Sequence, residues 1–387
     1  MMHEERRGTK GILGAALGLV LIAVLAVGGL VGFRALTEDD GSDRTTAGAT
    51  VAPTPDPLPS AAPSTAAPSS APPSASPSAS ASASASPSAA ETGPGSKTID
   101  PALQAAAERI TARNNAALVA LDIRNGEILA VTEQATSLSG NLAPGSTFKI
   151  VTTALLLNKG AVTPNTPVPC PATAFSGKPW KNMNDYANPG ATFKTDFAMS
   201  CNTAFVGLQD KITNTELSAF STEYFGLNSN AWTVRPGLAT TDGVVPPAVS
   251  DVDKVAQMLG QGELKMNPMT MASVTATAIT GQFRQPITER GGPVHTAPRK
   301  LTKKVSDDIR NMMVACATTG TAKSVFAGMN GVGAKTGTAE VGAGTNAWMV
   351  AYRGNIAVAV VVQGGTSGAG DAGPVVRAFL DAVPAGR

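Results

Sequence analysis

The stretch from residue 333 to residue 363, GAKTGTAEVGAGTNAWMVAYRGNIAVAVVVQ, decides the fold. It contains three runs that suit β-strands, at 333–341, 347–352 and 356–363, and glycine-containing turns separate them. Consecutive strands joined by short turns pair antiparallel. The stretch therefore predicts three strands of one antiparallel sheet.

Two more strand-like runs lie at the other end of the same region, at 117–123 and 127–132. Arg124-Asn125-Gly126 joins them, and an Asn-Gly pair supplies the positive φ angles of a tight hairpin. A helix is expected just before them. Asp100 offers an N-cap, Pro101 offers a first helical residue, and the apolar residues that follow recur at helical spacing.

Helical patterns occupy much of the remaining sequence, at 146–158, 266–280, 306–318 and 373–383. Together these elements predict a mixed α+β fold, in which strands from both ends form one antiparallel five-stranded sheet flanked by helices. The middle of the region then forms a second, mainly helical lobe. The cleft between the sheet and this lobe is the expected place for a functional site.

A long apolar run lies near the N-terminus. No residue from Gly11 to Phe33 is charged, and a helix of these 23 residues would be about 34 Å long, which is enough to cross a bilayer. The run is longer than the apolar core of a cleavable signal peptide, so we expect an uncleaved transmembrane anchor. The basic excess before the run places residues 1–10 in the cytoplasm and the chain beyond Phe33 outside it.

Residues 34–96 have the composition of a linker. From Ser60 to Ala90 every residue is Ala, Ser or Pro except Thr65. Such a segment buries too little apolar surface to offset the loss of chain entropy. We therefore expect a disordered tether between the anchor and a globular domain at 97–387, with a tolerated low-complexity insertion as the alternative explanation.

Composition excludes several classes of function. A formal net charge of +2 with 15% charged residues argues against a nucleic-acid binder. The only histidines, His3 and His295, are too few for a histidine-rich metal site, and no complete phosphate-loop or dinucleotide-binding motif is present. No metal or nucleotide cofactor is expected. Cys201 could be bridged to Cys170, although a buried free thiol is the expectation.

The segment Pro144-Gly145-Ser146-Thr147-Phe148-Lys149 leads into an apolar helix. Ser146 would lie in the first turn, where free N–H groups and the helix dipole favour developing negative charge, and Lys149 would lie on the same face. This suits a hydroxyl nucleophile and an amine base, provided that burial or another cation lowers the pKa of the lysine. Taken alone, the same pattern also describes an N-cap serine beside a solvated lysine.

Two further motifs add to this one. In Ser200-Cys201-Asn202 the hydroxyl can relay a proton and the amide can hold a substrate carbonyl. In Lys335-Thr336-Gly337-Thr338 the lysine and the hydroxyls can bind a carboxylate, and Gly337 would let a ligand approach the strand closely. The charge of Lys335 would also lower the pKa of Lys149. A second S-x-N match at Ser139 is rejected because it lies on the approach to the Ser146 helix.

The ordered set S-x-x-K, S-x-N and K-T-G resembles the signature of the penicillin-binding protein and serine β-lactamase superfamily. Over about residues 97–387 the sequence is similar to the transpeptidase domain of class B penicillin-binding proteins, especially the actinobacterial kind. The stretches that carry the resemblance are 99–104, 143–149, 200–205, 260–262, 335–340 and 347–352.

This resemblance implies that Ser146 is acylated by the D-Ala-D-Ala end of a peptidoglycan stem peptide, with Lys149 as its general base. Ser200 would pass the proton to the leaving D-alanine, and Asn202 would hold the substrate amide. The segment 335–338 would bind the terminal carboxylate through Lys335, Thr336 and Thr338. The backbone N–H groups of Ser146 and Thr338 would stabilise the oxyanion.

The implied partners are stem peptides, β-lactams as covalent inhibitors, the lipid bilayer through residues 11–33, and cell-wall synthesis proteins. Two alternatives stay open: a hydrolase of the same fold, which is a D,D-carboxypeptidase or β-lactamase, and a β-lactam sensor or scaffold. Class A β-lactamases activate water with a glutamate in an E-x-x-L-N pattern. The spacing from Glu223 to Asn228 is one residue too long for that pattern, so slow deacylation is expected.

Overall fold

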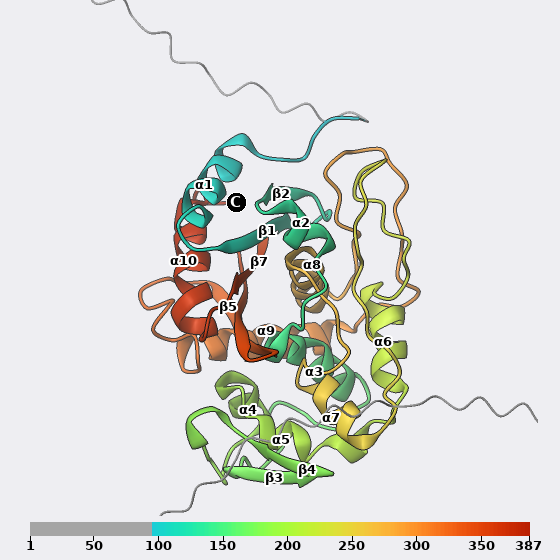
Figure 1. The fold of residues 1–387 in the computed structure, drawn as a ribbon, viewed down its shortest axis with the longest axis vertical. Coiled ribbons are helices and arrows are strands. Elements are labelled where there is room, and N and C mark those ends of the chain that lie inside the picture. The colour runs from blue at the N-terminus through green and yellow to red at the C-terminus, as the bar shows by residue number, and fades with distance from the viewer. Residues whose placement is uncertain (1–94) are drawn as a thin grey trace, which may run out of the picture. The chain divides into compact units, whose positions relative to one another are not determined.

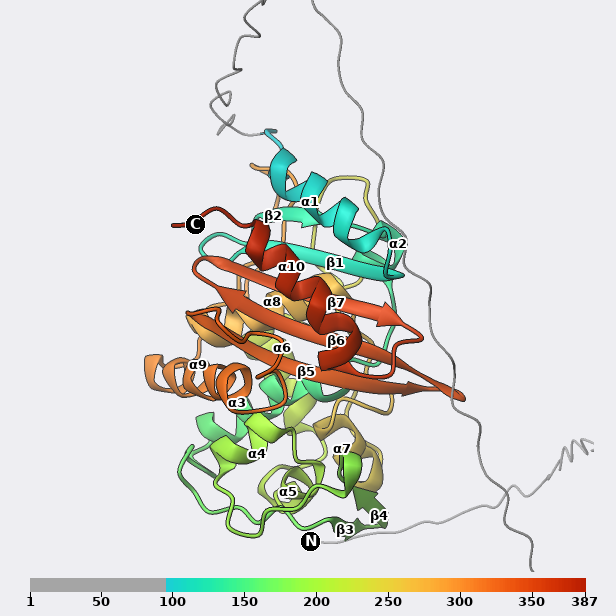
Figure 2. The ribbon, with the colours of Figure 1, turned by 90° about the vertical axis from the view of Figure 1, so that its left-hand side faces the viewer.

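The computed structural model describes residues 95–387, and a five-stranded antiparallel sheet forms its centre. The strand order is β2-β1-β7-β6-β5, as Figure 2 shows. The strands are β1 (Ala116–Asp122), β2 (Ile128–Val131), β5 (Val332–Val341), β6 (Gly344–Arg353) and β7 (Ile356–Gln363). Because β7 pairs with both β1 and β6, the sheet is assembled from both ends of the described region, and the predicted fold class is confirmed.

The side chains of the inner strands alternate between two apolar cores. On β7, Val358 and Val360 face one core, whereas Ala357, Ala359 and Val361 face the other. A strand buried on both faces is apolar at every position, which is why this segment is a continuous apolar run. The helices α1 (Pro101–Thr111) and α10 (Gly373–Ala382) cover one face, and α8 (Pro268–Thr280) covers the other (Figure 1).

Local sequence signals explain most helix starts. The Asp100 carboxylate accepts the N–H groups of Ala102 and Leu103 and caps α1. The helix α9 (Lys303–Thr318) begins three residues earlier than expected because the Thr302 side chain caps it. In the first hairpin only Gly126 adopts a positive φ, and the Asn125 side chain instead accepts the N–H of Glu127.

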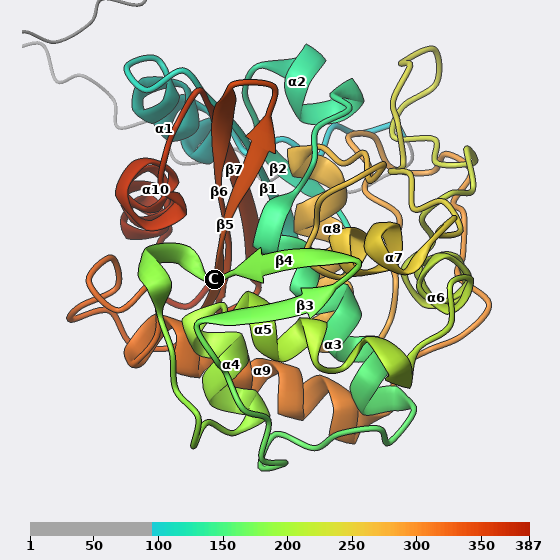
Figure 3. The ribbon, with the colours of Figure 1, turned by 60° about the horizontal axis from the view of Figure 1, so that its bottom comes forward.

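The middle of the chain forms the second lobe. Its helices are α3 (Lys149–Asn158), α4 (Phe193–Met199), α5 (Asn202–Val206), α6 (Glu216–Phe225) and α7 (Asp251–Met258). The short helix α2 (Gln134–Ser139) lies instead against β1 and α8. The lobe also contains a hairpin that the sequence did not predict, made of β3 (Thr173–Ser176) and β4 (Lys178–Lys181). Figure 3 shows this hairpin beside α5. Its strands are short and mostly exposed, so no apolar alternation marks them in the sequence.

Three of the predicted segments fall wholly or mainly before residue 95, namely the tail 1–10, the anchor 11–33 and the linker 34–96. They lie outside the described residues, apart from the last two positions of the linker. Within residues 95–387, no helix has both the length and the apolar character needed to cross a membrane.

Candidate active site

A cavity of about 1120 Å³ opens between β5 and the second lobe. One wall is β5, and the opposite wall is formed by the β3–β4 hairpin and the turn between α4 and α5. The predicted site residues that line it are Ser146, Ser200, Asn202, Thr336, Gly337 and Thr338. The two predicted lysines, Lys149 and Lys335, are fully buried and do not line the cavity. All three motifs therefore meet around one cavity.

Three glycines bring the Ser146 turn against β5. Ser146 lies in a short 3-10 turn, Gly145–Phe148, that runs into α3. Gly145 has a φ of +53°, and a Cβ atom there would lie 2.5 Å from the Thr338 carbonyl oxygen. A Cβ on Gly260 would lie 1.7 Å from the Gly145 carbonyl oxygen, and one on Gly337 would lie 2.9 Å from the Thr147 side chain. The close backbone approach at these points requires residues without a side chain.

Lys149 projects from the start of α3 into the Ser200–Asn202 segment. Its Nζ donates to the Ser200 carbonyl oxygen at 2.9 Å and to the Asn202 Oδ1 at 2.8 Å. Burial lowers its pKa well below the usual value, and the charge of Lys335 lowers it further. These are the two causes that the sequence predicted. Among the described residues, none is hydrogen-bonded to the Ser146 hydroxyl, so the predicted proton transfer from Ser146 to Lys149 stays a prediction.

Lys335 lies behind Ser200 and not in the open part of the cavity. Its Nζ donates to the Ser200 Oγ at 2.8 Å and to the Thr336 carbonyl oxygen at 3.0 Å, and burial lowers its pKa to about 8. A carboxylate in the cavity would therefore meet the lining threonines, Thr336 and Thr338, first, and the charge of Lys335 would act on it from behind Ser200. Ser200 itself has a left-handed backbone, with φ 58° and ψ 31°, and both lysines bond to it.

The hydroxyls on β5 are ordered by a residue that sequence reasoning missed. The Thr336 and Thr321 Oγ1 atoms lie 2.6 Å apart, and Thr321 also lines the cavity. Its backbone N–H donates to the Ala198 carbonyl oxygen at 3.0 Å, which ties this segment to α4. No motif marks Thr321, because it acts through a contact between distant segments.

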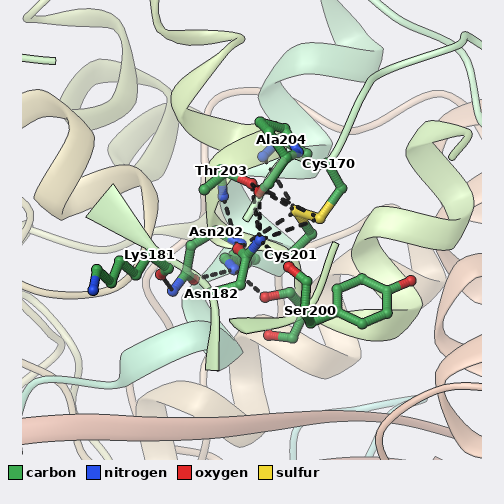
Figure 4. Close-up of a disulfide and its surroundings, with 11 residues drawn as sticks. Cys170, Lys181, Asn182, Ser200, Cys201, Asn202, Thr203 and Ala204 are labelled. Atoms are coloured by element: carbon green, nitrogen blue, oxygen red, sulfur yellow. Dashed lines mark hydrogen bonds between the residues drawn. A yellow bond between two sulfur atoms is a disulfide. The ribbon is translucent and has the colours of Figure 1, made fainter. Parts of the chain in front are cut away.

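A disulfide joins Cys170 to Cys201, and the prediction of a free thiol at Cys201 is wrong. The bridge spans 31 positions. Cys170 is placed for it by two backbone hydrogen bonds with Asn188, which no local pattern reveals. Cys316 is the free cysteine of the described region, and it is buried. The disulfide fixes one end of the Ser200–Asn202 turn to the segment that precedes the hairpin (Figure 4).

Asn182 holds the same turn from the other side. Its Oδ1 accepts the backbone N–H groups of Asn202 at 2.7 Å and Thr203 at 3.0 Å. Its Nδ2 donates to the carbonyl oxygens of Pro171 and Tyr186, as Figure 4 shows in part. The Asn202 Nδ2 in turn donates to the Lys181 carbonyl oxygen at 2.9 Å. Nothing in the local sequence distinguishes Asn182 from the nearby Asn184.

Glu223 and His295 lie away from the cavity. Glu223 forms an ion pair with Arg299 at 3.5 Å. The His295 ring packs edge-on against Phe283, and its backbone N–H donates to the Gln285 side chain. Among the described residues that line the cavity, Glu340 is the only one with a carboxylate.

The fold and the three motifs around this cavity are typical of the penicillin-binding class of proteins. The family model described as the penicillin binding protein transpeptidase domain matches residues 116–381, and the chain belongs to this family.

Curated relatives carry the same domain. The chain is 30% identical over 286 residues to the peptidoglycan D,D-transpeptidase PbpA of Mycolicibacterium smegmatis, a match that covers 64% of this chain and 56% of that protein. It is 26% identical over 278 residues to PbpA of Mycobacterium tuberculosis, with the same coverage. The chain thus spans little more than half the length of these relatives.

Solved structures agree with the fold. The ceftriaxone acyl-enzyme complex of penicillin-binding protein A from M. tuberculosis has a TM-score of 0.66 at 24% identity, covering 74% of this chain and 79% of that one. Penicillin-binding protein 2 of Pseudomonas aeruginosa in complex with WCK 5153 has a TM-score of 0.67 at 25% identity, covering 74% of each chain. A Helicobacter pylori penicillin-binding protein 2 in complex with MreC has a TM-score of 0.64 at 20% identity, covering 73% of this chain and 62% of that one.

Proposed function

We propose that this protein is a membrane-anchored peptidoglycan D,D-transpeptidase that forms an acyl-enzyme at Ser146. The observation that carries the proposal is the convergence of S-x-x-K, S-x-N and K-T-G on one cavity, with the Lys149 amine buried and its pKa lowered. An amine of lowered pKa is available in its neutral form, which is the form that can accept a proton.

In the acylation step the Ser146 Oγ attacks the carbonyl carbon of the penultimate D-alanine of a stem peptide. Lys149 accepts the hydroxyl proton, and the carbonyl oxygen becomes an oxyanion held by the N–H groups of Ser146 and Thr338. Each such donor contributes typically about 3 kcal/mol. Collapse of this intermediate breaks the bond to the terminal D-alanine, whose nitrogen takes a proton through Ser200. Asn202 holds the substrate amide, and the terminal carboxylate lies against Thr336 and Thr338.

In the second step the amine of a neighbouring stem peptide attacks the ester carbonyl. The new amide is the cross-link, and Ser146 recovers its proton. A β-lactam acylates the same serine when its ring amide opens, but its former leaving nitrogen stays attached to the acyl group and remains in the cavity. Glu223 is paired with Arg299 and does not line the cavity, so it is not placed to activate water. This favours slow hydrolysis of the acyl-enzyme and argues against the β-lactamase alternative.

The proposed setting is the outer face of the cell membrane. The apolar run 11–33 would anchor the chain and the Ala/Ser/Pro-rich segment would tether the domain, with residues 1–10 inside. Proteins of cell-wall synthesis are the expected partners, in line with the MreC complex of the H. pylori protein.

Covalent labelling tests the nucleophile. We expect the full-length chain to be labelled by fluorescent penicillin and to lose all labelling in Ser146→Ala. The matched control is Ser139→Ala, because Ser139 belongs to the rejected S-x-N match, bonds to the Ala239 carbonyl oxygen and does not line the cavity. Labelling that survives Ser146→Ala would overturn the acyl-enzyme.

Product analysis separates the transpeptidase from its alternatives. Incubation with stem pentapeptide and an acceptor peptide is expected to yield a cross-linked dimer and one D-alanine per cross-link. D-Alanine released without dimer would indicate a D,D-carboxypeptidase, and rapid loss of the penicillin label would indicate a β-lactamase. Labelling without any turnover would indicate a sensor or scaffold.

A further inference from the structure

A buried carboxyl group lies directly behind the cavity. Asp196 occupies α4, one helical turn before Ser200, and its side chain has no exposure to solvent. Within the described region neither carboxylate oxygen has a hydrogen-bond partner. Buried carboxyl groups are ordinarily paired or hydrogen-bonded, so this one needs an explanation.

The backbone of Asp196 is hydrogen-bonded to the segment that carries Ser200, although no described residue is hydrogen-bonded to its side chain. Its carbonyl oxygen accepts the N–H of Cys201 at 2.8 Å, directly beside Ser200. A carboxylate oxygen lies within 4.8 Å of the sulfur atoms of Cys170 and Cys201, and these sulfurs are oxidised to the disulfide. Asp196 is therefore fixed next to the Ser200–Asn202 turn, and the same turn binds the Lys149 amine.

Ionisable groups on three other elements belong to the same buried region. Lys149 on α3 acts on Asp196, and Lys335 on β5 acts in turn on Lys149. The helix α9, which packs against α4, carries the buried thiol of Cys316. Lys194, on α4 itself, is exposed. Among the described residues, Asp196 is the only acid whose charge acts on Lys149. The site thus holds two buried amines and one buried carboxyl group.

The charges of these groups act on Lys149 in opposite directions. The positive charge of Lys335 lowers the pKa of Lys149, whereas the negative charge of ionised Asp196 raises it. Burial raises the pKa of Asp196 to about 7, against the lowering effect of Lys149. The charge of Asp196 and the protonation of Lys149 are therefore coupled.

We propose that Asp196 is a positioning residue that acts through Lys149. The charge on its carboxyl group sets the pH at which Lys149 loses its proton and Ser146 becomes reactive. The role deepens the proposed function and rests on it. Below neutral pH the carboxyl group is uncharged and leaves the amine free to deprotonate. Above neutral pH the carboxylate holds a proton on Lys149 and restrains the serine.

The pH profile of acylation distinguishes this role from a structural one. The second-order rate of acylation by a chromogenic β-lactam is measured from pH 5 to pH 10 for the full-length wild type and for Asp196→Asn. The ratio of variant to wild type should be near one below about pH 6, where the wild-type carboxyl group is itself neutral. The ratio should rise to about tenfold above pH 7, where the wild-type carboxyl group is charged. At still higher pH Lys149 is neutral in both proteins, and the ratio should return towards one.

The control variant is Thr153→Val on α3. Thr153 is buried, and its hydroxyl also has no partner among the described residues, but the substitution removes no charge. Its ratio to wild type should be independent of pH. The wild type alone gives a second readout that needs no variant: the logarithm of the rate should rise with unit slope below pH 6, flatten near pH 7 and then resume its rise.

The possible failures are distinct. A ratio for Asp196→Asn that is the same at every pH, or a wild-type profile without an inflection near pH 7, would overturn the role of Asp196 and leave the acyl-enzyme intact. A wild type that is not acylated at any pH would overturn the proposed function and this role with it.

Discussion

The two walls of the cavity are built by different means. The β5 wall is held by ten consecutive residue pairs with β6, from Val332 to Val341, and by a close glycine contact with the Ser146 turn. The Ser200–Asn202 wall is held by a few side chains, namely Asn182, the Cys170–Cys201 disulfide and the Lys149 amine. A ladder spreads its stability over many repeated bonds, whereas a turn held by single side chains depends on each of them. The second wall should therefore be the more sensitive to single substitutions.

The largest effect is expected at Lys149, the proposed general base, which holds the Ser200–Asn202 wall. Lys149→Met keeps the buried volume but removes the amine, and we expect acylation to fall by about a thousandfold because general-base catalysis is lost. Stopped-flow acylation by a chromogenic β-lactam measures the change. Lys254→Met is the control, since Lys254 is a buried lysine that pairs with Asp251 and does not line the cavity. A loss smaller than tenfold in Lys149→Met would exclude this lysine as the base.

A pair of asparagines compares the two walls directly. Asn182→Ala leaves two backbone N–H groups of the Ser200–Asn202 wall without their acceptor, and we expect acylation to fall by about a hundredfold as Ser200 is displaced. Asn346→Ala removes one acceptor, for the Gly364 N–H, on the sheet side and should leave acylation nearly unchanged.

The variant Asn182→Asp tests the mechanism of that loss. It keeps the oxygen acceptor for the two N–H groups but lacks the donor, so it should recover part of the activity. Equal losses in Asn182→Ala and Asn346→Ala would show that the two walls do not differ in sensitivity.

Removal of the disulfide should have a smaller effect on acylation and a clear effect on stability. The double variant Cys170→Ser, Cys201→Ser opens a loop of 31 positions, which corresponds to about 4 kcal/mol of unfolding free energy. Acylation should fall by about tenfold, because Asn182 still holds the turn. Urea unfolding and the labelling rate measure the two effects. An unchanged unfolding midpoint would indicate that the bridge does not stabilise this wall.

The smallest effect is a change in how stability depends on pH. The pKa of Asp196 in the folded protein, about 7, lies above its ordinary value of 3.8, so the folded state keeps a proton that the unfolded state releases. The stabilisation is complete at low pH and is lost as the pH rises through 7. Between pH 5 and pH 7 the wild type should lose about 2 kcal/mol of unfolding free energy relative to Asp196→Asn. Parallel curves for the two proteins would contradict this assignment.

The difference between the walls also explains what the sequence could predict. The strands of the β5 wall carry their own signals, since β7 is a continuous apolar run. Gly337 was expected to let a ligand approach the strand, whereas in the structure Thr147 and Pro144 of the Ser146 turn lie against it. The Ser146 turn could also be predicted, because its proline, its glycine and the apolar helix that follows are contiguous in the sequence.

The contacts that complete the other wall join segments that are distant in the sequence. Cys170 meets Cys201 only after the intervening residues fold back, and Asn182 reaches Asn202 across twenty positions. The spacing of apolar residues along the sequence does not predict such contacts. Asp196 is the partial exception, because an acid between Phe193 and Phe197 on a helix that leads to Ser200 is out of place in an apolar pattern.

The position of β7 between β1 and β6 has a consequence for how the protein matures. The Ser146 turn leaves the ribosome nearly two hundred residues before β5, and β6 cannot join β1 until β7 has followed. A nascent chain therefore carries Ser146 through synthesis with one side of the cavity missing. The cavity is therefore complete only after the last strand, β7, has joined β1 to β6 in the sheet.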